Sequence, residues 1–213
     1  MEQITKKVYD VISKGGVALI KLNVAYALIG HTCEAVHHIF ELKRRPPERK
    51  GVMLGNPNLF KELSISLYHK RVEVFTYPVG LVTKINHASK YASQIPDEAK
   101  HNERVAIFVN MGELGDRVSN YAFTKGKLIF GSSANISNAG NHYSFDEVED
   151  EIRKNVDFAV DLGQTEFQEL RPDGKGYSST MIDLENDLLL RRGLLCDKVV
   201  QQAREMGLKI PNY

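Results

Sequence analysis

The chain is 213 residues long, a length that one large domain accounts for most simply. Its hydrophobic fraction of 42% and charged fraction of 26% are those of a folded globular protein, which excludes a disordered tail or a fibrous repeat. Lys and Arg number 28 against 27 Asp and Glu. The composition therefore excludes a uniformly basic protein, and a charged partner must bind a local patch.

The apolar runs of the sequence are short. Val17–Ile20 is a typical one, far below the roughly 18 residues of a bilayer-spanning helix. The first residues also lack the apolar stretch of a secretory signal, so we expect a cytoplasmic protein with no membrane segment. The two cysteines, Cys33 and Cys196, belong to no CxxC pair and are expected to be buried free thiols.

Helical and strand patterns alternate along the chain. Glycines and prolines mark several boundaries, because proline lacks an amide donor and glycine commonly ends helices. In chain order we predict a helix over 2–14, a strand over 17–20, a helix over 33–44, a strand over 52–54, a helix around 60–68, strands over 81–85 and 104–109, a helix over 113–123, a strand over 128–130, a helix over 145–154, strands over 157–160, 179–184 and 188–191, and a C-terminal helix from about 197.

This order predicts the α/β class, with one domain over residues 1–213 built from a twisted mixed sheet and flanking helices. Segment 162–177 holds three glycines and a proline, a composition that favours a mobile loop.

The first segment that could carry chemistry is Lys43–Gly51, in which five cations and one anion precede the glycine. Arginine donates paired hydrogen bonds to phosphate, and lysine adds a point charge. The segment therefore predicts a site for a triphosphate or an RNA backbone. A solvated basic loop at a helix C-terminus explains the same composition.

Two further segments carry small polar residues beside predicted strands. Ser132, Ser133 and Asn135 follow an apolar strand, where ligands commonly bind in α/β sheets, although an ordinary turn has a similar composition. The strand pair 177–184 and 188–193 has hydroxyls at its entry and arginines at its exit. It would either close over a nucleotide or form a simple hairpin.

Two other polar clusters give weaker indications of function. Cys33, His37 and His38 suggest a metal cluster, but adjacent histidines on a helix point about 100° apart, so no metal ligand is assigned. Segment Ser144–Asp161 holds seven carboxylates and two cations, which is typical of a solvated helix surface.

Four motifs occur in the same order as in the YrdC-like family, whose best-known members are the threonylcarbamoyl-AMP synthases of tRNA modification. The chain resembles this family over nearly its whole length. The motifs are Gly15-Gly16, Lys43-Arg44-Arg45-Pro46, Ser133-Ala134-Asn135-Ile136-Ser137 and Ser179-Thr180-Met181-Ile182-Asp183-Leu184, followed by Leu189-Leu190-Arg191.

The resemblance implies an α/β fold with a basic cavity that binds ATP as a substrate, with Mg²⁺ shared by the triphosphate. Bicarbonate and threonine would form a carbamate that attacks the α-phosphate and releases pyrophosphate. No catalytic residue is assigned, because orientation and charge neutralisation supply most of such catalysis. The phosphates are expected at Lys43, Arg45, Lys50, Ser133, Asn135 and Arg191, and the acceptor near Val24, Tyr26, Phe108 and Ser179.

The departures from the family pattern concentrate on the amino-acid side. Segment Lys21–Leu28 keeps Tyr26 but lacks the two threonines of the family's first motif, and Phe108 stands where the family has an arginine for the amino acid's carboxylate. A buried carboxylate without a partner costs several kcal/mol. The sequence therefore leaves the acceptor open between threonine and another small amino acid.

Three functions follow. The first is a nucleotidyltransferase that makes a carbamoyl-adenylate from ATP, bicarbonate and an amino acid for tRNA modification. The second is a catalytically degenerate module that binds a nucleotide, tRNA or double-stranded RNA. The third is a scaffold protein that has the fold alone.

Overall fold

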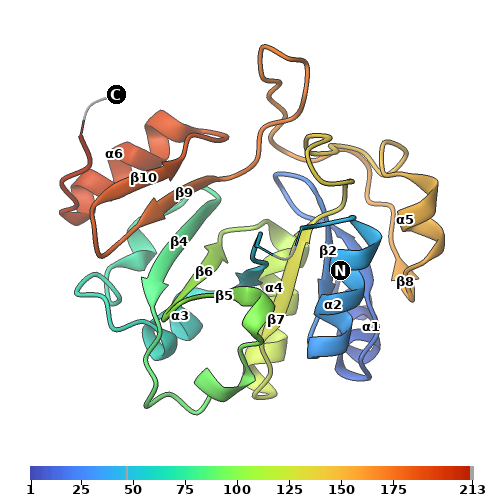
Figure 1. Ribbon diagram of the computed structural model, residues 1–213, viewed down its shortest axis with the longest axis horizontal. Helices are drawn as coiled ribbons and strands as arrows, with labels where there is room; N and C mark the ends of the chain where they lie inside the picture. Colours follow the sequence, from blue (N-terminus) through green and yellow to red (C-terminus); the bar gives the residue numbers. More distant parts are fainter. Residues whose placement is uncertain (47, 212–213) are drawn as a thin grey trace.

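The computed structural model describes residues 1–46 and 48–211. Within them, ten strands form one mixed sheet (Figure 1). The strands are β1 (Ala18–Lys21), β2 (Tyr26–Gly30), β3 (Val52–Leu54), β4 (Val79–Lys84), β5 (Lys100–His101), β6 (Arg104–Val109), β7 (Ile129–Ser133), β8 (Phe158–Ala159), β9 (Thr180–Asp183) and β10 (Leu188–Arg191).

Across the sheet the strand order is β10-β9-β4-β6-β3-β7-β2-β1-β8, with β5 paired to β6. The pairs β1/β8, β3/β6 and β4/β9 are parallel, and the other pairs are antiparallel. The predicted α/β class with a mixed sheet and flanking helices is confirmed. The helices are α1 (Glu2–Ser13), α2 (Cys33–Leu42), α3 (Pro57–Leu63), α4 (Glu113–Thr124), α5 (Asp150–Lys154) and α6 (Cys196–Met206).

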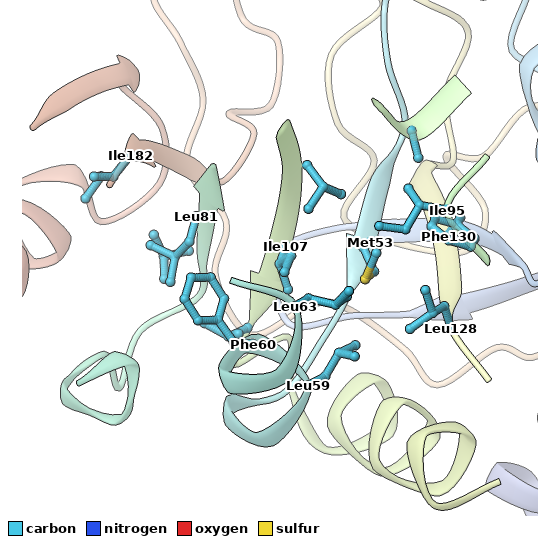
Figure 2. Packing of buried hydrophobic residues seen from close by; sticks show 14 of the residues in the cluster. Met53, Leu59, Phe60, Leu63, Leu81, Ile95, Ile107, Leu128, Phe130 and Ile182 are labelled. Atoms are coloured by element: carbon cyan, nitrogen blue, oxygen red, sulfur yellow. The ribbon is translucent and has the colours of Figure 1, made fainter. Parts of the chain in front are cut away.

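One face of the sheet is covered along its length. Met53, Ile107 and Leu81 on neighbouring strands pack against Leu59, Phe60 and Leu63 of α3 (Figure 2). Burying each such apolar side chain stabilises the fold by about 1.5–3 kcal/mol. Helix α2 covers the same face at β2 and β7, and α6 contributes to the same core. We call this the closed face.

The opposite face is covered over only part of its width. Helices α1 and α4 pack against each other there, and the buried Val8 and Val118 share a core with Ile20 and Ile29. Farther along, the side chains of β6, β4 and β9 line two cavities instead. We call this part, which includes Val82, Ala106, Phe108 and Met181, the open floor.

Two predicted helices differ most from the structure in their bounds. The helix expected around 60–68 begins at Pro57, because the Asn56 side chain caps its start by accepting from the Leu59 amide at 2.9 Å. It ends at Leu63, where Ser64 turns to an extended conformation. The helix expected over 145–154 is reduced to α5. Ahead of it, the Glu147 carboxylate accepts from the Tyr143 and Ser144 amides, which holds a non-helical turn.

Other differences are smaller. The predicted elements omit β2, whose five residues are all buried and so lack the alternation that marks a half-buried strand. Cys196 is buried as expected, but Cys33 is exposed because it begins α2 beside the capping residue Thr32. In the described residues, no helix combines the length and the hydropathy that crossing a bilayer requires.

Candidate functional site

A cavity of about 650 Å³ lies between the open floor, the turn after α2, the loop after β7 and segment 171–179. It brings together most of the residues predicted for the site, although they come from six separate parts of the chain. Those that line it are Val24, Lys43, Arg45, Phe108, Ser133, Asn135, Ser179 and Arg191.

The turn after α2 sends three consecutive cations in different directions. Arg44 adopts a left-handed conformation with φ 48°, and the Arg45 amide donates to the Phe40 carbonyl at 2.8 Å. Lys43 and Arg45 therefore face the cavity. Arg44 points outward, and its Nη2 lies 2.8 Å from a carboxylate oxygen of Glu151.

Lys43 connects this turn to the loop after β7. Only 1% of the residue is exposed, and its Nζ donates to the Ser133 carbonyl and to the Asn135 carbonyl at 2.6 Å. Burial, aided by repulsion from Arg45, lowers the pKa of Lys43 to about 7. The lysine therefore holds the backbone of the site in addition to lining it.

Arg45 is oriented by three neutral groups. Its Nη1 donates to the Ser132 hydroxyl at 3.0 Å, and its other donors bind the Arg49 and Lys50 carbonyls at 3.1 and 2.5 Å. Burial, with Arg49 nearby, lowers the pKa of Arg45. Within the described residues, no carboxylate pairs with this guanidinium.

Arg191 reaches the same place from β10. Its Nε donates to the Ser179 carbonyl at 2.8 Å, and it forms no ion pair within the described residues. Burial, together with repulsion from Arg45, lowers the pKa of Arg191 to about 10. Two half-buried guanidinium groups close enough to repel each other favour binding of an anion between them.

The loop after β7 adds small polar groups. Strand β7 extends to Ser133, so the two serines predicted to follow the strand in fact end it. The Ser137 amide donates to the Lys43 carbonyl at 3.0 Å, and its Oγ is buried without a hydrogen-bond partner among the described residues. Ser137 is thus a free donor and acceptor on the cavity wall.

The acceptor end of the cavity is apolar. Leu22, Val24 and Met111 line it together with Phe108, whose ring lies over Gly80. A Cβ atom at Gly80 would stand 2.3 Å from that ring, so only glycine lets Phe108 lie flat on β4. Neither Val24 nor Phe108 offers a charge to an amino acid's carboxylate.

Two predicted site residues lie elsewhere. Tyr26 points to the closed face, because side chains alternate along β2 and Ala27 faces the cavity instead. The Tyr26 hydroxyl donates to the Gly163 carbonyl at 2.8 Å, outside the cavity. Lys50 does not line this cavity but a second one, which adjoins the first.

Segment 171–179 supplies residues that the prediction missed. Arg171 and Lys175 line the cavity, and the buried Arg171 Nε has no hydrogen-bond partner among the described residues. The Tyr143 hydroxyl donates to the Glu169 carbonyl at the base of this segment. In the sequence these two cations flank Asp173-Gly174. That arrangement could have indicated a binding role.

The residues present do not fit a metal ion held by the protein. Asp173 supplies the carboxylate among the described residues that line the cavity. Its Oδ2 atom lies 3.2 Å from Arg171 Nη2. Mg²⁺ prefers carboxylate and phosphate oxygens. Any Mg²⁺ would therefore have to enter on the phosphates of a ligand.

Comparisons with known proteins agree with this fold. The sequence model of the Sua5, YciO and YrdC proteins, described as telomere recombination, matches residues 10–193. No curated protein matches the chain. P. abyssi Sua5, solved in complex with L-threonine, is 20% identical with a TM-score of 0.76, over 99% of this chain and 60% of that one.

Two other solved structures are similar. E. coli YciO is 13% identical with a TM-score of 0.67, over 91% of this chain and 90% of that one. Full-length HypF in its phosphate- and nucleotide-bound form is 13% identical with a TM-score of 0.64, over 84% of this chain and 27% of that one. The chain thus spans about 60% of the Sua5 chain and a smaller part of HypF. With the family match extending over residues 10–193, this chain belongs to the Sua5/YciO/YrdC family.

Proposed function

We propose that this protein binds ATP in the 650 Å³ cavity and converts ATP, bicarbonate and a small amino acid into a carbamoyl-adenylate. The observation that carries the proposal is the pair Arg45 and Arg191, which face one cavity with no carboxylate partner among the described residues. The solved structures of HypF with phosphate and nucleotide and of Sua5 with L-threonine support it.

The chemistry needs two steps. The amine of the amino acid attacks the carbon of bicarbonate, and water leaves to give a carbamate. A carbamate oxygen then attacks the α-phosphorus, and the bond from that phosphorus to the bridging oxygen of the β-phosphate breaks. Pyrophosphate leaves, and the carbamoyl-adenylate remains.

The protein's part in this reaction is to orient the reactants and to offset charge. Arg45 and Arg191 would stabilise the negative charge on the reacting phosphoryl oxygens. The hydroxyls of Ser133 and Ser137 would orient the leaving pyrophosphate beside them. Such preorganised donors cost no reorganisation when the reaction occurs.

The acceptor is proposed to be a small amino acid with an apolar side chain rather than threonine. Val24, Phe108 and Met111 enclose the apolar end of the cavity. A threonine hydroxyl buried against them without a partner would cost about 1–3 kcal/mol. The product would serve tRNA modification in the cytoplasm.

The test is pyrophosphate release by the purified protein with ATP, Mg²⁺, bicarbonate and a panel of small amino acids. We expect bicarbonate-dependent release with an apolar amino acid, and a loss of about 100-fold in Arg191→Met, because one donor to a developing charge is worth about that factor. Arg117→Met is the matched control, since Arg117 lies exposed on α4. No release with any amino acid, under conditions in which a Sua5 enzyme is active, would overturn the proposal.

A nucleotide-binding module without turnover is the second candidate. The apolar acceptor end, where Val24 and Phe108 offer no charge to a carboxylate, favours it. ATP binding by calorimetry without pyrophosphate release would identify this function.

A further inference from the structure

Strand β10 is the last strand at its end of the sheet, and its outer edge has no partner strand (Figure 1). Within the described residues, the backbone of Leu188–Arg191 forms no backbone hydrogen bond other than those of its pairing with β9. Helix α6 follows β10 in the chain but packs mainly against residues 72–74. The outer edge of β10 therefore presents amide and carbonyl groups with which a further strand can pair.

The middle of β10 exposes two leucine side chains. Leu188 is 43% and Leu190 is 49% exposed, whereas Leu189 between them packs, half-buried, against the core of the closed face. Leu188 lies opposite Asp183, which lines the second cavity, and Leu190 lines that cavity itself, so both leucines lie on the side of the open floor. Edge strands are commonly guarded by lysine or proline. This edge instead carries exposed leucines, which a further strand would cover.

The two ends of this strand carry opposite charges. Asp187 precedes the leucines and Arg192 follows them. Asp187 forms no ion pair among the described residues, and Arg192 has only an exposed contact of 2.8 Å with Asp197. If two such strands pair antiparallel, the acidic end of each lies beside the basic end of the other, whereas a parallel pair would bring like charges together. The strand is therefore complementary in charge to a second copy of itself.

The shape of β10 also favours a second copy as its partner. Antiparallel pairing about Leu189 places Leu188 of each copy opposite Leu190 of the other, so a two-fold axis forms two leucine pairs. The strand is short, and the register shift between Leu189 and Arg191 increases its twist, which fits poorly to a long flat strand. Because such a pair uses both outer edges, the assembly closes at two copies.

We infer that β10 is a self-association edge, through which two copies of the chain pair antiparallel about Leu189 and join their sheets. The two open floors then lie on the same face of the joined sheet. Since β10 also supplies Arg191 to the first cavity, the cavities of the two copies lie on either side of the shared edge. The inference does not depend on the proposed function, because it uses the outer edge of the strand and not the chemistry of the cavity.

The test is the molar mass of the protein by analytical ultracentrifugation over a concentration series. We expect the unaltered protein to form a dimer as its concentration rises. Leu188→Lys puts a cation into both leucine pairs and should weaken association about tenfold or more. Leu67→Lys is the matched control, because Leu67 is 93% exposed in the loop after α3, outside β10, and its change should leave association within about twofold. A chain that stays monomeric throughout would overturn the inference and leave the edge to a strand of another protein.

A mixing experiment tests the two-fold pairing itself. Leu188→Lys and Leu188→Glu should each associate weakly alone, yet an equal mixture should form a heterodimer. Diagonal neighbours across an antiparallel pair are about 7–8 Å apart, which two long side chains of opposite charge can span. A mixture that associates no better than its components would contradict the pairing about Leu189.

Hydrogen exchange of the unaltered protein does not depend on how any variant folds. The amides of β10 should exchange more slowly as the protein concentration rises, because the second copy accepts their hydrogen bonds. Slowing confined to other segments would place the interface elsewhere and overturn the inference.

Discussion

The surroundings of the Lys43 side chain differ strongly from those of a lysine side chain in water. Its ammonium group lies among backbone carbonyls, and the pKa is lowered from 10.5 to about 7. Between these two values the unfolded chain binds more protons at this residue than the folded chain does. The contribution of Lys43 to the free energy of unfolding therefore rises with pH from about 7 to about 10.5.

This leads to a prediction for Lys43→Met. Urea unfolding at several pH values above 7 should show that the stability of the unaltered protein relative to the variant increases with pH, because only the unaltered protein relieves the cost of a buried charge. Lys154→Met, which removes an exposed lysine, is the control for loss of charge. A difference that stays constant or falls with pH would contradict the prediction.

Lys43, Arg44 and Arg45 form one basic cluster in the sequence, but their side chains point in different directions in the structure. The left-handed backbone at Arg44 lets its neighbours turn inward and leaves Arg44 itself on the surface. Such a conformation is uncommon for arginine. It separates Arg44, which faces solvent, from Lys43 and Arg45, which line the cavity.

At the scale of elements, α3 supports the open floor from behind. Its Leu59, Phe60 and Leu63 pack under β3, β4 and β6, whose other sides carry the cavity residues (Figure 2). The helix has only two turns, so its start depends on the Asn56 cap. Asn56 is itself buried, and its Nδ2 donates to the Ser119 hydroxyl at 3.4 Å.

We predict that Asn56→Ala lowers the free energy of unfolding by about 1–2 kcal/mol, because the Leu59 amide loses its acceptor. Asn56→Asp keeps an acceptor at the cap and should recover part of the loss. Urea unfolding of the three proteins measures this. An Asn56→Asp variant less stable than Asn56→Ala would show that packing, not capping, sets the role of Asn56.

For segment 162–177, the amino-acid composition and the structure suggest different degrees of mobility. Its composition predicts a mobile loop, yet its backbone is tied to the rest of the fold at Leu162, Gly163 and Glu169. Beyond Glu169, Arg171, Asp173 and Lys175 line the cavity. Composition reflects only the conformational freedom of the segment itself. The hydrogen bonds that hold the segment are made by residues outside it, in β2 and at Tyr143.

At the scale of the molecule, the near-neutral net charge includes two oppositely charged segments that the fold brings into contact. Residues 43–50 are basic and residues 144–161 are acidic. Arg44 pairs with Glu151, and Arg153 pairs within the acidic segment with Asp146 at 3.3 Å. Lys43 and Arg45 are turned inward. Of the remaining cations of the basic segment, Arg49 and Lys50, which line the first and the second cavity, form no ion pair among the described residues.

Binding to double-stranded RNA should therefore be weak. With about two phosphate contacts, the logarithm of affinity should fall with the logarithm of salt concentration with a slope of about −2, since each contact contributes about −0.9. Fluorescence anisotropy with a labelled duplex over a salt series measures the slope. A slope of about −5 or steeper would revive the RNA-binding module.

The amino-acid sequence by itself determined the elements whose signals are local. The periodic apolar residues of α1 and α4 and the alternation in 104–109 need no distant partner to be recognised. The short motifs at Lys43, Ser133, Ser179 and Arg191 likewise indicated the family and part of the cavity wall.

Tertiary structure alone decided how those pieces act together. The bond from Lys43 to Asn135 joins residues 92 positions apart, and the junction of Arg45 with Arg191 depends on the pairing of strands that no local pattern specifies. The direction of Tyr26, the covering of Lys43 and the second cavity over Ala106 all follow from which face of the sheet the helices cover. Side-chain periodicity shows which residues share a face, but only packing against distant elements decides which face is buried.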